Sequence, residues 1–163
     1  MENSPDKEPL FNQLIEEHSR LINRICYFYS TQKHTYEDLR QEVFISIWKG
    51  LEKFRGESKI STFIYRIAVN SALMVLRSNE TKISTLPLDL GSVELSSSFD
   101  DEQKERLEHM YQLIQTLEKI DRAIILLWLD EKSYQEIAEI LGMTKSLVAI
   151  RIHRIKKKLS KLS

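Results

Sequence analysis

The chain has 163 residues, of which 24 are basic and 24 acidic, so its formal net charge is zero. Hydrophobic residues make up 42% of the sequence, which excludes a disordered chain and is sufficient for a packed core. The 4 glycines and 3 prolines are too few for the frequent turns of a β-sandwich or barrel, and a single cysteine excludes a disulfide framework. No apolar run approaches the ~20 residues that cross a bilayer, and the polar start MENSPDKEP is not a signal peptide. We therefore expect an all-α cytoplasmic protein.

Apolar residues recur every three or four positions in three stretches of the first half, which predicts three amphipathic helices. The first stretch runs from Phe11 to Cys26. The second follows Thr35, a suitable N-cap, and places Leu39 and Phe54 at the two ends of its apolar face. The third runs over residues 63–76. Three helices of this length can share one core, so we predict a helical domain over residues 9–78.

The periodicity is lost over residues 79–101, where serines cluster with Pro87 and Gly91, and residues 81–101 carry a net charge of −3. About twenty aperiodic residues are too many for an ordinary loop within a compact domain, so we predict a flexible linker. The alternative is an additional packed element that docks through the leucines of this segment.

Helical periodicity resumes over residues 102–162, which predicts a second domain. Its expected helix ends are Asp121 as a cap, the capping box of Ser133 and Glu136, Gly142 as a left-handed stop, and Thr144 as the last cap.

Residues 134–153 have the pattern of a helix-turn-helix. Small Ala138 stands where two helices must approach closely, Gly142 stands at the turn, and Val148 stands where the second helix packs on the first. Seven basic residues and no acidic one lie between Thr144 and Ser163. An ordinary helical hairpin with a solvated basic face is the alternative. The motif and the localised charge together favour DNA binding.

Asp38, Gln41 and Glu42 share one face of the second predicted helix, opposite its apolar stripe. By themselves they fit a solvated face. Catalytic carboxylates would need a neighbouring histidine, a metal cluster or a phosphate-binding loop. The four histidines are scattered, one cysteine cannot complete a zinc site, and no glycine-rich phosphate loop occurs, so we expect no metal, no cofactor and no enzyme.

Several runs of residues now carry a family resemblance. The runs 38–44, 54–58 and 62–70, read as DLRQEVF, FRGES and TFIYRIAVN, resemble in this order the second conserved region of extracytoplasmic-function (ECF) sigma factors of bacterial RNA polymerase. The run YQEIA at 134–138, followed by Leu141, Gly142, Arg151 and Arg154, is similar to their fourth region. The resemblance covers about residues 9–78 and 102–162.

The resemblance implies two small helical domains joined by a flexible linker, the second containing a helix-turn-helix. Such a sigma factor binds core RNA polymerase and directs promoter-specific transcription initiation without being an enzyme. The first domain would bind polymerase and the −10 element, and the second would bind the −35 duplex. The implied partners are core RNA polymerase, promoter DNA and an anti-sigma factor, either free or tethered to a membrane, with no small-molecule substrate.

Residue roles follow from matched motif positions and from the local charge. The polymerase-binding residues would be Asp38, Gln41 and Glu42. The −10 strand would meet Arg55, Lys59, Thr62, Tyr65, Arg66 and Asn70. The −35 helix would use Lys145, Ser146, Leu147, Ala149, Ile150, Arg151, Arg154, Lys157 and Lys158.

For three of these positions, and for Phe63 beside them, the sequence carries a further expectation. Tyr65 falls off the apolar stripe of its helix, so we expect it to be exposed, whereas the spacing of Phe63 favours the core over contact with DNA. The family often has a basic and then a small polar residue where this chain has Ala149 and Ile150. These side chains cannot hydrogen-bond to bases, and apolar contact with thymine methyls is the alternative there.

Two other classes of protein remain open. One is a stand-alone helix-turn-helix regulator whose first half senses a signal or dimerises, and the other is a small hydrolase. A sensor domain needs neither the acidic face of the second helix nor the run 55–70, and a hydrolase needs a catalytic constellation that the sequence does not contain.

Overall fold

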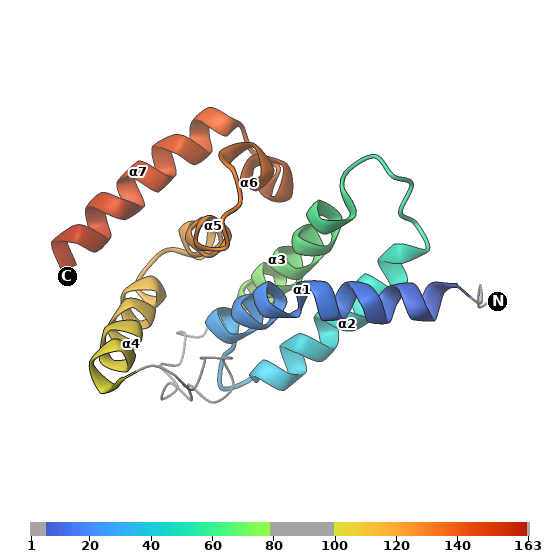
Figure 1. The fold of residues 1–163 in the computed structure, drawn as a ribbon, viewed down its shortest axis with the longest axis horizontal. Coiled ribbons are helices and arrows are strands. Elements are labelled where there is room, and N and C mark those ends of the chain that lie inside the picture. Colours follow the sequence, from blue (N-terminus) through green and yellow to red (C-terminus); the bar gives the residue numbers. More distant parts are fainter. Residues whose placement is uncertain (1–5, 79–99, 163) are drawn as a thin grey trace. The chain divides into compact units, whose positions relative to one another are not determined.

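The computed structural model describes residues 6–78 and 100–162, which belong to two compact units (Figure 1). Within these described ranges there are seven α-helices and no strands, three helices in the first unit and four in the second. The predicted linker, 79–101, lies outside the described residues except for its last two, which begin a helix of the second unit.

The N-terminal unit consists of α1 (Lys7–Tyr29), α2 (Tyr36–Leu51) and α3 (Ile60–Ser78), each of which packs against the other two. As predicted, Thr35 caps α2, because its Oγ1 accepts a hydrogen bond from the Asp38 backbone N–H at 3.3 Å. The apolar faces of all three helices form one core. Its fully enclosed side chains include Leu21, Ile22, Ile25, Leu39, Val43, Ile47, Ile64, Ala68 and Ala72.

Gly50 allows α2 and α3 to approach closely where α2 ends. A Cβ at this position would lie 2.9 Å from Cζ of Phe63 and 2.9 Å from Cδ1 of Ile67, well inside van der Waals contact. Because Gly50 has no side chain, the ends of the Phe63 and Ile67 side chains can lie against α2 just before the loop of residues 52–59.

Phe54 lies in this loop and not in the helix whose stripe it extends in sequence, because α2 ends at Leu51. Its ring packs on Phe63 of α3, with 4.9 Å between the ring centroids and 42° between the ring planes. Both side chains are half-buried, so they close the base of the loop while keeping part of each ring accessible.

The C-terminal unit consists of α4 (Asp101–Gln115), α5 (Lys119–Leu129), α6 (Tyr134–Leu141) and α7 (Lys145–Leu162). Three predicted helix ends are confirmed. Ser133 and Glu136 form a capping box, Gly142 adopts the left-handed conformation at φ 68°, and Thr144 Oγ1 accepts from the Leu147 N–H at 3.1 Å. The enclosed side chains of the core include Ile114, Ile124, Leu126, Leu127, Ile137, Val148 and Ile152.

The prediction that Asp121 caps a helix is wrong. The backbone N–H of Arg122 already bonds the Glu118 carbonyl at 2.9 Å, so α5 has begun before Asp121 is reached. This early start also places the Arg122 guanidinium, only 1% exposed, beside the end of α4. There Nη2 donates to the carbonyl oxygen of Gln115, the last residue of α4, at 3.0 Å and to that of Leu117, in the turn after α4, at 3.1 Å.

By length and apolar content alone, Ile60–Arg77 of α3 could cross a membrane, although the sequence led us to expect no such run. The apolar side chains Ile64, Ala68, Ala72 and Leu76 are buried between α1 and α2. A helix that packs against two neighbours needs apolar side chains on both of these sides, which accounts for the apolar content of α3.

Candidate nucleic-acid interface

Helices α6 and α7 form the helix-turn-helix that the sequence predicts. The turn passes through left-handed Gly142, after which the Met143 N–H bonds the Ala138 carbonyl at 3.0 Å. Ala138 and Val148 are both buried where α6 and α7 pack together. A small residue on one helix and a branched residue on the other let the two axes approach, so α7 is held firmly with one side outward.

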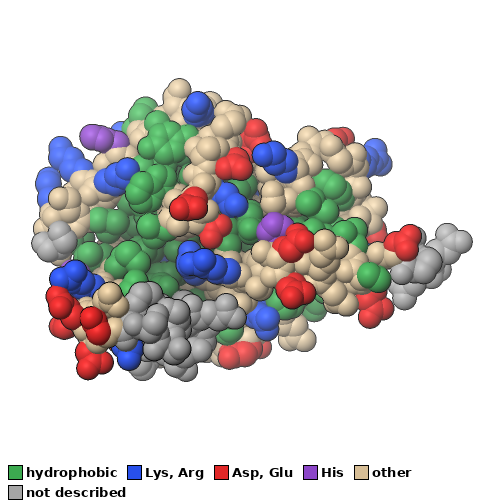
Figure 2. All heavy atoms as spheres, in the orientation of Figure 1, with side chains coloured by type: hydrophobic (Ala, Val, Ile, Leu, Met, Phe, Trp, Pro, Cys, Tyr) green, Lys and Arg blue, Asp and Glu red, His purple; other side chains and the backbone are tan. Residues whose placement is uncertain are grey.

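The outward side of α7 combines polar, apolar and basic side chains. We call the exposed residues Ser146, Leu147, Ile150 and Arg154 the reading face. Lys145 precedes it, Ala149 is half-buried at its edge, and further lysines, including Lys157 and Lys158, continue the basic surface to the end of the helix. Figure 2 shows Lys and Arg side chains gathered where the C-terminal half of α7 lies, at the left of the view. This surface can bind phosphates over two turns of helix.

Arg151 lies at the edge of this face but its guanidinium is already engaged. Nη1 donates to Oδ1 of Asp121 on α5 at 2.8 Å, and the two side chains are only 31% and 23% exposed. This pair ties α7 to α5. The motif match predicts that Arg151 contacts DNA. Its partner Asp121 lies 30 residues earlier in the chain, so no local pattern could predict this ion pair.

A second cationic surface lies on the loop of residues 52–59 and the outer side of α3. Arg55, Lys59, Arg66 and Asn70 are exposed there, as their predicted contact with DNA requires. Gly56 has φ 75° and no atom within 4 Å of a Cβ position, so the loop turns in open space.

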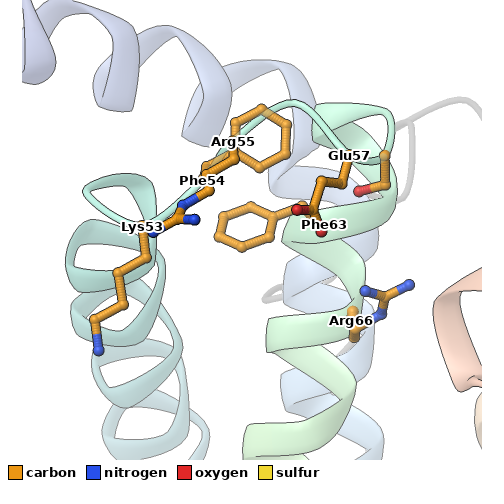
Figure 3. A pocket seen from close by; sticks show the side chains of 7 residues that line it. Lys53, Phe54, Arg55, Glu57, Phe63 and Arg66 are labelled. Atoms are coloured by element: carbon orange, nitrogen blue, oxygen red, sulfur yellow. The ribbon is translucent and has the colours of Figure 1, made fainter.

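This loop and α3 enclose a pocket of about 370 Å³, which we call the strand pocket (Figure 3). The rings of Phe54 and Phe63 face it, and Lys53, Arg55 and Arg66 add three basic residues to its lining. Its lining residues are Lys53, Phe54, Arg55, Glu57, Ser58, Phe63 and Arg66. Of these, Arg55 and Arg66 were among the predicted site residues, whereas Phe63 was expected to belong to the core. Lys53 and Glu57 were not predicted, although their places two residues to either side of Arg55 could have suggested them. Aromatic faces among cations suit an unpaired base and its phosphates.

The expected exposure of Tyr65 is wrong, since this residue is 4% exposed. Its Oη lies 2.7 Å from Nδ1 of His18 on α1, and the two rings meet edge to face. Thr62, another predicted contact, is 2% exposed. Because α3 packs against both α1 and α2, its buried face is wider than a single stripe. These two side chains support the surface from beneath.

Asp38, Gln41 and Glu42 are all exposed on α2, as the helical spacing predicts. Ile45 lies one turn further along and is 47% exposed. We call the first three residues the acidic face. The core-facing side of α2 is taken up by Leu39 and Val43, so the acidic face points away from the unit's interior.

The comparisons with known proteins agree with this arrangement. The family model of Sigma-70 region 2 matches residues 14–81, and that of Sigma-70, region 4 matches residues 107–159. The RNA polymerase sigma factor YlaC of Bacillus subtilis is 30% identical over 159 residues, which cover 94% of this chain and 90% of YlaC. The ECF RNA polymerase sigma factor SigE of Mycolicibacterium smegmatis is 28% identical over 155 residues. The chain belongs to the ECF family of RNA polymerase sigma factors.

The matched part covers 90% of this sigma factor but 58% of the longer M. smegmatis protein. Among solved structures, the sigma factor RpoE of Bartonella quintana superimposes with a TM-score of 0.74 over 93% of this chain and 95% of that one, at 19% identity. At that identity the likeness shows a shared fold, namely helical sigma-factor domains.

Membership in the family confirms the all-α fold with its two sigma-factor domains, and it confirms the function. This sigma factor binds core RNA polymerase and directs promoter-specific transcription initiation, and sigma factors are not enzymes. The hydrolase and the stand-alone regulator are therefore excluded. The roles of individual residues stay predictions.

Proposed function

We propose that this sigma factor acts in the cytoplasm and divides promoter recognition between three surfaces. The acidic face binds core polymerase, the strand pocket captures an unpaired strand of the −10 element, and α7 docks on the −35 duplex. The observation that carries the proposal is the position of α7, whose inner side is locked by Val148, Ile152 and Ile155 while its outer side is exposed and basic.

At the −35 element, the first turns of α7 enter the major groove, as the second helix of a helix-turn-helix does. Lys145, Ser146, Leu147, Ala149 and Ile150 lie in these turns, where side chains reach base edges. Arg154, Lys157 and Lys158 follow along the helix and bind phosphates. Arg151 keeps α7 in place through Asp121.

At the −10 element, the protein must compensate the lost stacking of DNA, which is on the order of 1.4 kcal/mol per base-pair step. Stacking on an aromatic face returns about 1–3 kcal/mol per base. The half-buried rings of Phe54 and Phe63 offer such faces, and Arg55, Lys59 and Arg66 bind the strand's phosphates. Asn70 reads a base edge further along α3, above the support given by Thr62 and Tyr65.

The acidic face is proposed to meet a basic surface of polymerase, where charge complementarity raises the association rate and the specificity. Run-off transcription with core polymerase and genomic promoter fragments tests the whole assignment. Glu42→Lys should weaken capture of core polymerase several-fold while leaving helicity unchanged. Glu16→Lys, an equal charge reversal at an exposed position of α1, is the matched control. Unchanged capture by the double variant Asp38→Lys, Glu42→Lys would disprove the role of the acidic face.

Inhibition by an anti-sigma factor is the last part of the proposal. The B. quintana sigma factor RpoE was solved in complex with the anti-sigma factor NepR. We propose that an anti-sigma factor, free or tethered to a membrane, likewise holds this chain until a signal arrives. Affinity purification from unstressed cells should recover such a protein with the sigma factor. Constitutive transcription from its promoters in those cells would contradict the proposal.

A further inference from the structure

The centre of the reading face is apolar. Ile150 is 50% exposed and Leu147 is 38% exposed, on a helix whose buried side is already complete. Ile150 lies in one row with Ser146 and Arg154, four residues to either side, and Leu147 lies three residues before it. Side chains at these spacings are neighbours on a helix, so the two apolar groups form one patch.

The hydrogen-bonding groups that usually read guanine are missing from this patch. Arginine reads guanine by donating two hydrogen bonds to O6 and N7. The arginine nearest the patch, Arg151, instead donates from Nη1 to Asp121 at 2.8 Å with its side chain 31% exposed. Arg154 lies a full turn beyond Ile150, among the cations that suit phosphates. Lys145 and Ser146 are the exposed polar side chains of the first turn, and beyond them Leu147 and Ile150 offer DNA only methyl and methylene groups.

We propose that the −35 element of this sigma factor places thymine 5-methyl groups against Ile150 and Leu147, so that specificity at these positions comes from methyl contact. The thymine methyl is the apolar group that base pairs present in the major groove. An amino or keto group of another base would lose its hydration against these side chains without gaining a hydrogen bond. The inference rests on the proposed docking of α7 on the −35 duplex, and the basic residues flanking the patch favour DNA as its occupant.

The test uses holoenzyme assembled from core polymerase and the full chain. Duplexes randomised over the −35 region are selected for binding, and a selected duplex is then synthesised with uracil in place of each fixed thymine, which removes only the methyl group. We expect fixed thymines, and about fourfold weaker binding for each methyl removed at a contacted position. With Ile150→Ser, the holoenzyme should bind duplexes with thymine or uracil at one position of the element equally well. With Leu147→Ser, this loss of preference should occur at a neighbouring position.

Leu162→Ser is the matched control, because Leu162 lies on the same helix, is 48% exposed and stands beyond the reading face. It should keep the full thymine preference, and circular dichroism should show equal helicity for all variants. A fixed guanine-rich element, or equal affinity for thymine and uracil duplexes, would overturn this inference and leave the docking of α7 intact. Enrichment of no −35 sequence would overturn the docking as well. If Ile150→Ser lost polymerase binding but kept the thymine preference, the patch would face protein and not DNA.

Discussion

Arg151 and Arg154 lie three residues apart on α7, yet their guanidinium groups have different surroundings. Arg154 is exposed, whereas Arg151 is tied to Asp121 on α5 in a partly buried pair. Removing one partner leaves a half-enclosed charge without its counter-charge. We expect Asp121→Ala to lower the free energy of unfolding of the C-terminal unit by about 1–2 kcal/mol.

Urea denaturation followed by Trp128 fluorescence measures this effect, with Trp48→Phe in the background so that the signal comes from the C-terminal unit alone. Arg154→Ala is the control and should leave the midpoint unchanged. Equal stability of Asp121→Ala and the background protein would show that the ion pair does not hold α7, and Arg151 would then be free to act on DNA.

Cys26 illustrates how complete the enclosure of the N-terminal core is. Burial raises the pKa of its thiol to about 12, and nearby Arg40 only partly opposes this effect. The folded state therefore holds the neutral thiol, while the unfolded chain ionises from about pH 9. The contribution to stability is complete below pH 9 and is lost as the pH rises towards 12, by about 1.4 kcal/mol per pH unit. The unfolding free energy should fall more steeply above pH 9 for this protein than for Cys26→Ala. Parallel pH profiles would contradict the prediction.

At the scale of helices, Gly50 decides how α2 meets α3. In a helix interior, alanine is more favourable than glycine by about 1 kcal/mol. Helix propensity alone therefore predicts that Gly50→Ala is stabilising. The new methyl would instead stand 2.9 Å from Phe63 and Ile67, and such overpacking costs about 1–3 kcal/mol. We expect net destabilisation in thermal unfolding and weaker strand capture, because the ring of Phe63 lines the strand pocket. A higher midpoint for Gly50→Ala would show that Phe63 moves aside freely.

The sequence predicts those features of the fold that depend on residues close together along the chain. The periodicity of apolar residues predicts every helix in the described residues, and the hydrogen-bonding chemistry of their side chains predicts the caps at Thr35, Ser133 and Thr144. The errors concern tertiary packing and the exact start of a helix. Tyr65 is buried against α1, where its hydroxyl lies 2.7 Å from Nδ1 of His18, 47 residues earlier, and Asp121 is no cap because α5 already begins after Glu118. A pattern read along one helix does not show how many neighbours the helix will have, so exposure on a helix packed on two sides is the least predictable property.

At the scale of the molecule, two small units on one chain each offer a modest DNA-binding surface. The net charge over residues 102–163 is +3, whereas residues 1–80 are balanced. With so little net positive charge, we expect neither unit alone to make the extensive phosphate contacts that give tight binding at physiological salt. Linkage through one chain and one polymerase raises the effective concentration of the second contact once the first is made. Promoter affinity should therefore depend on the assembled holoenzyme.

This division of labour predicts two distinguishable classes of defective variant. Arg66→Ala and Asn70→Ala should leave binding of a −35-containing duplex intact but impair strand opening, since we propose that the exposed side of α3 meets DNA only after the bases separate. A promoter with a pre-melted −10 region should restore most of their transcription. Arg154→Ala acts before opening, so it should weaken duplex binding, reduce the dependence on salt by about one unit of slope per phosphate contact, and gain little from pre-melting. The measurements are duplex binding at several salt concentrations and run-off transcription on both templates. If pre-melting restored both classes equally, the −10 and −35 roles would not be separated between the two units as proposed.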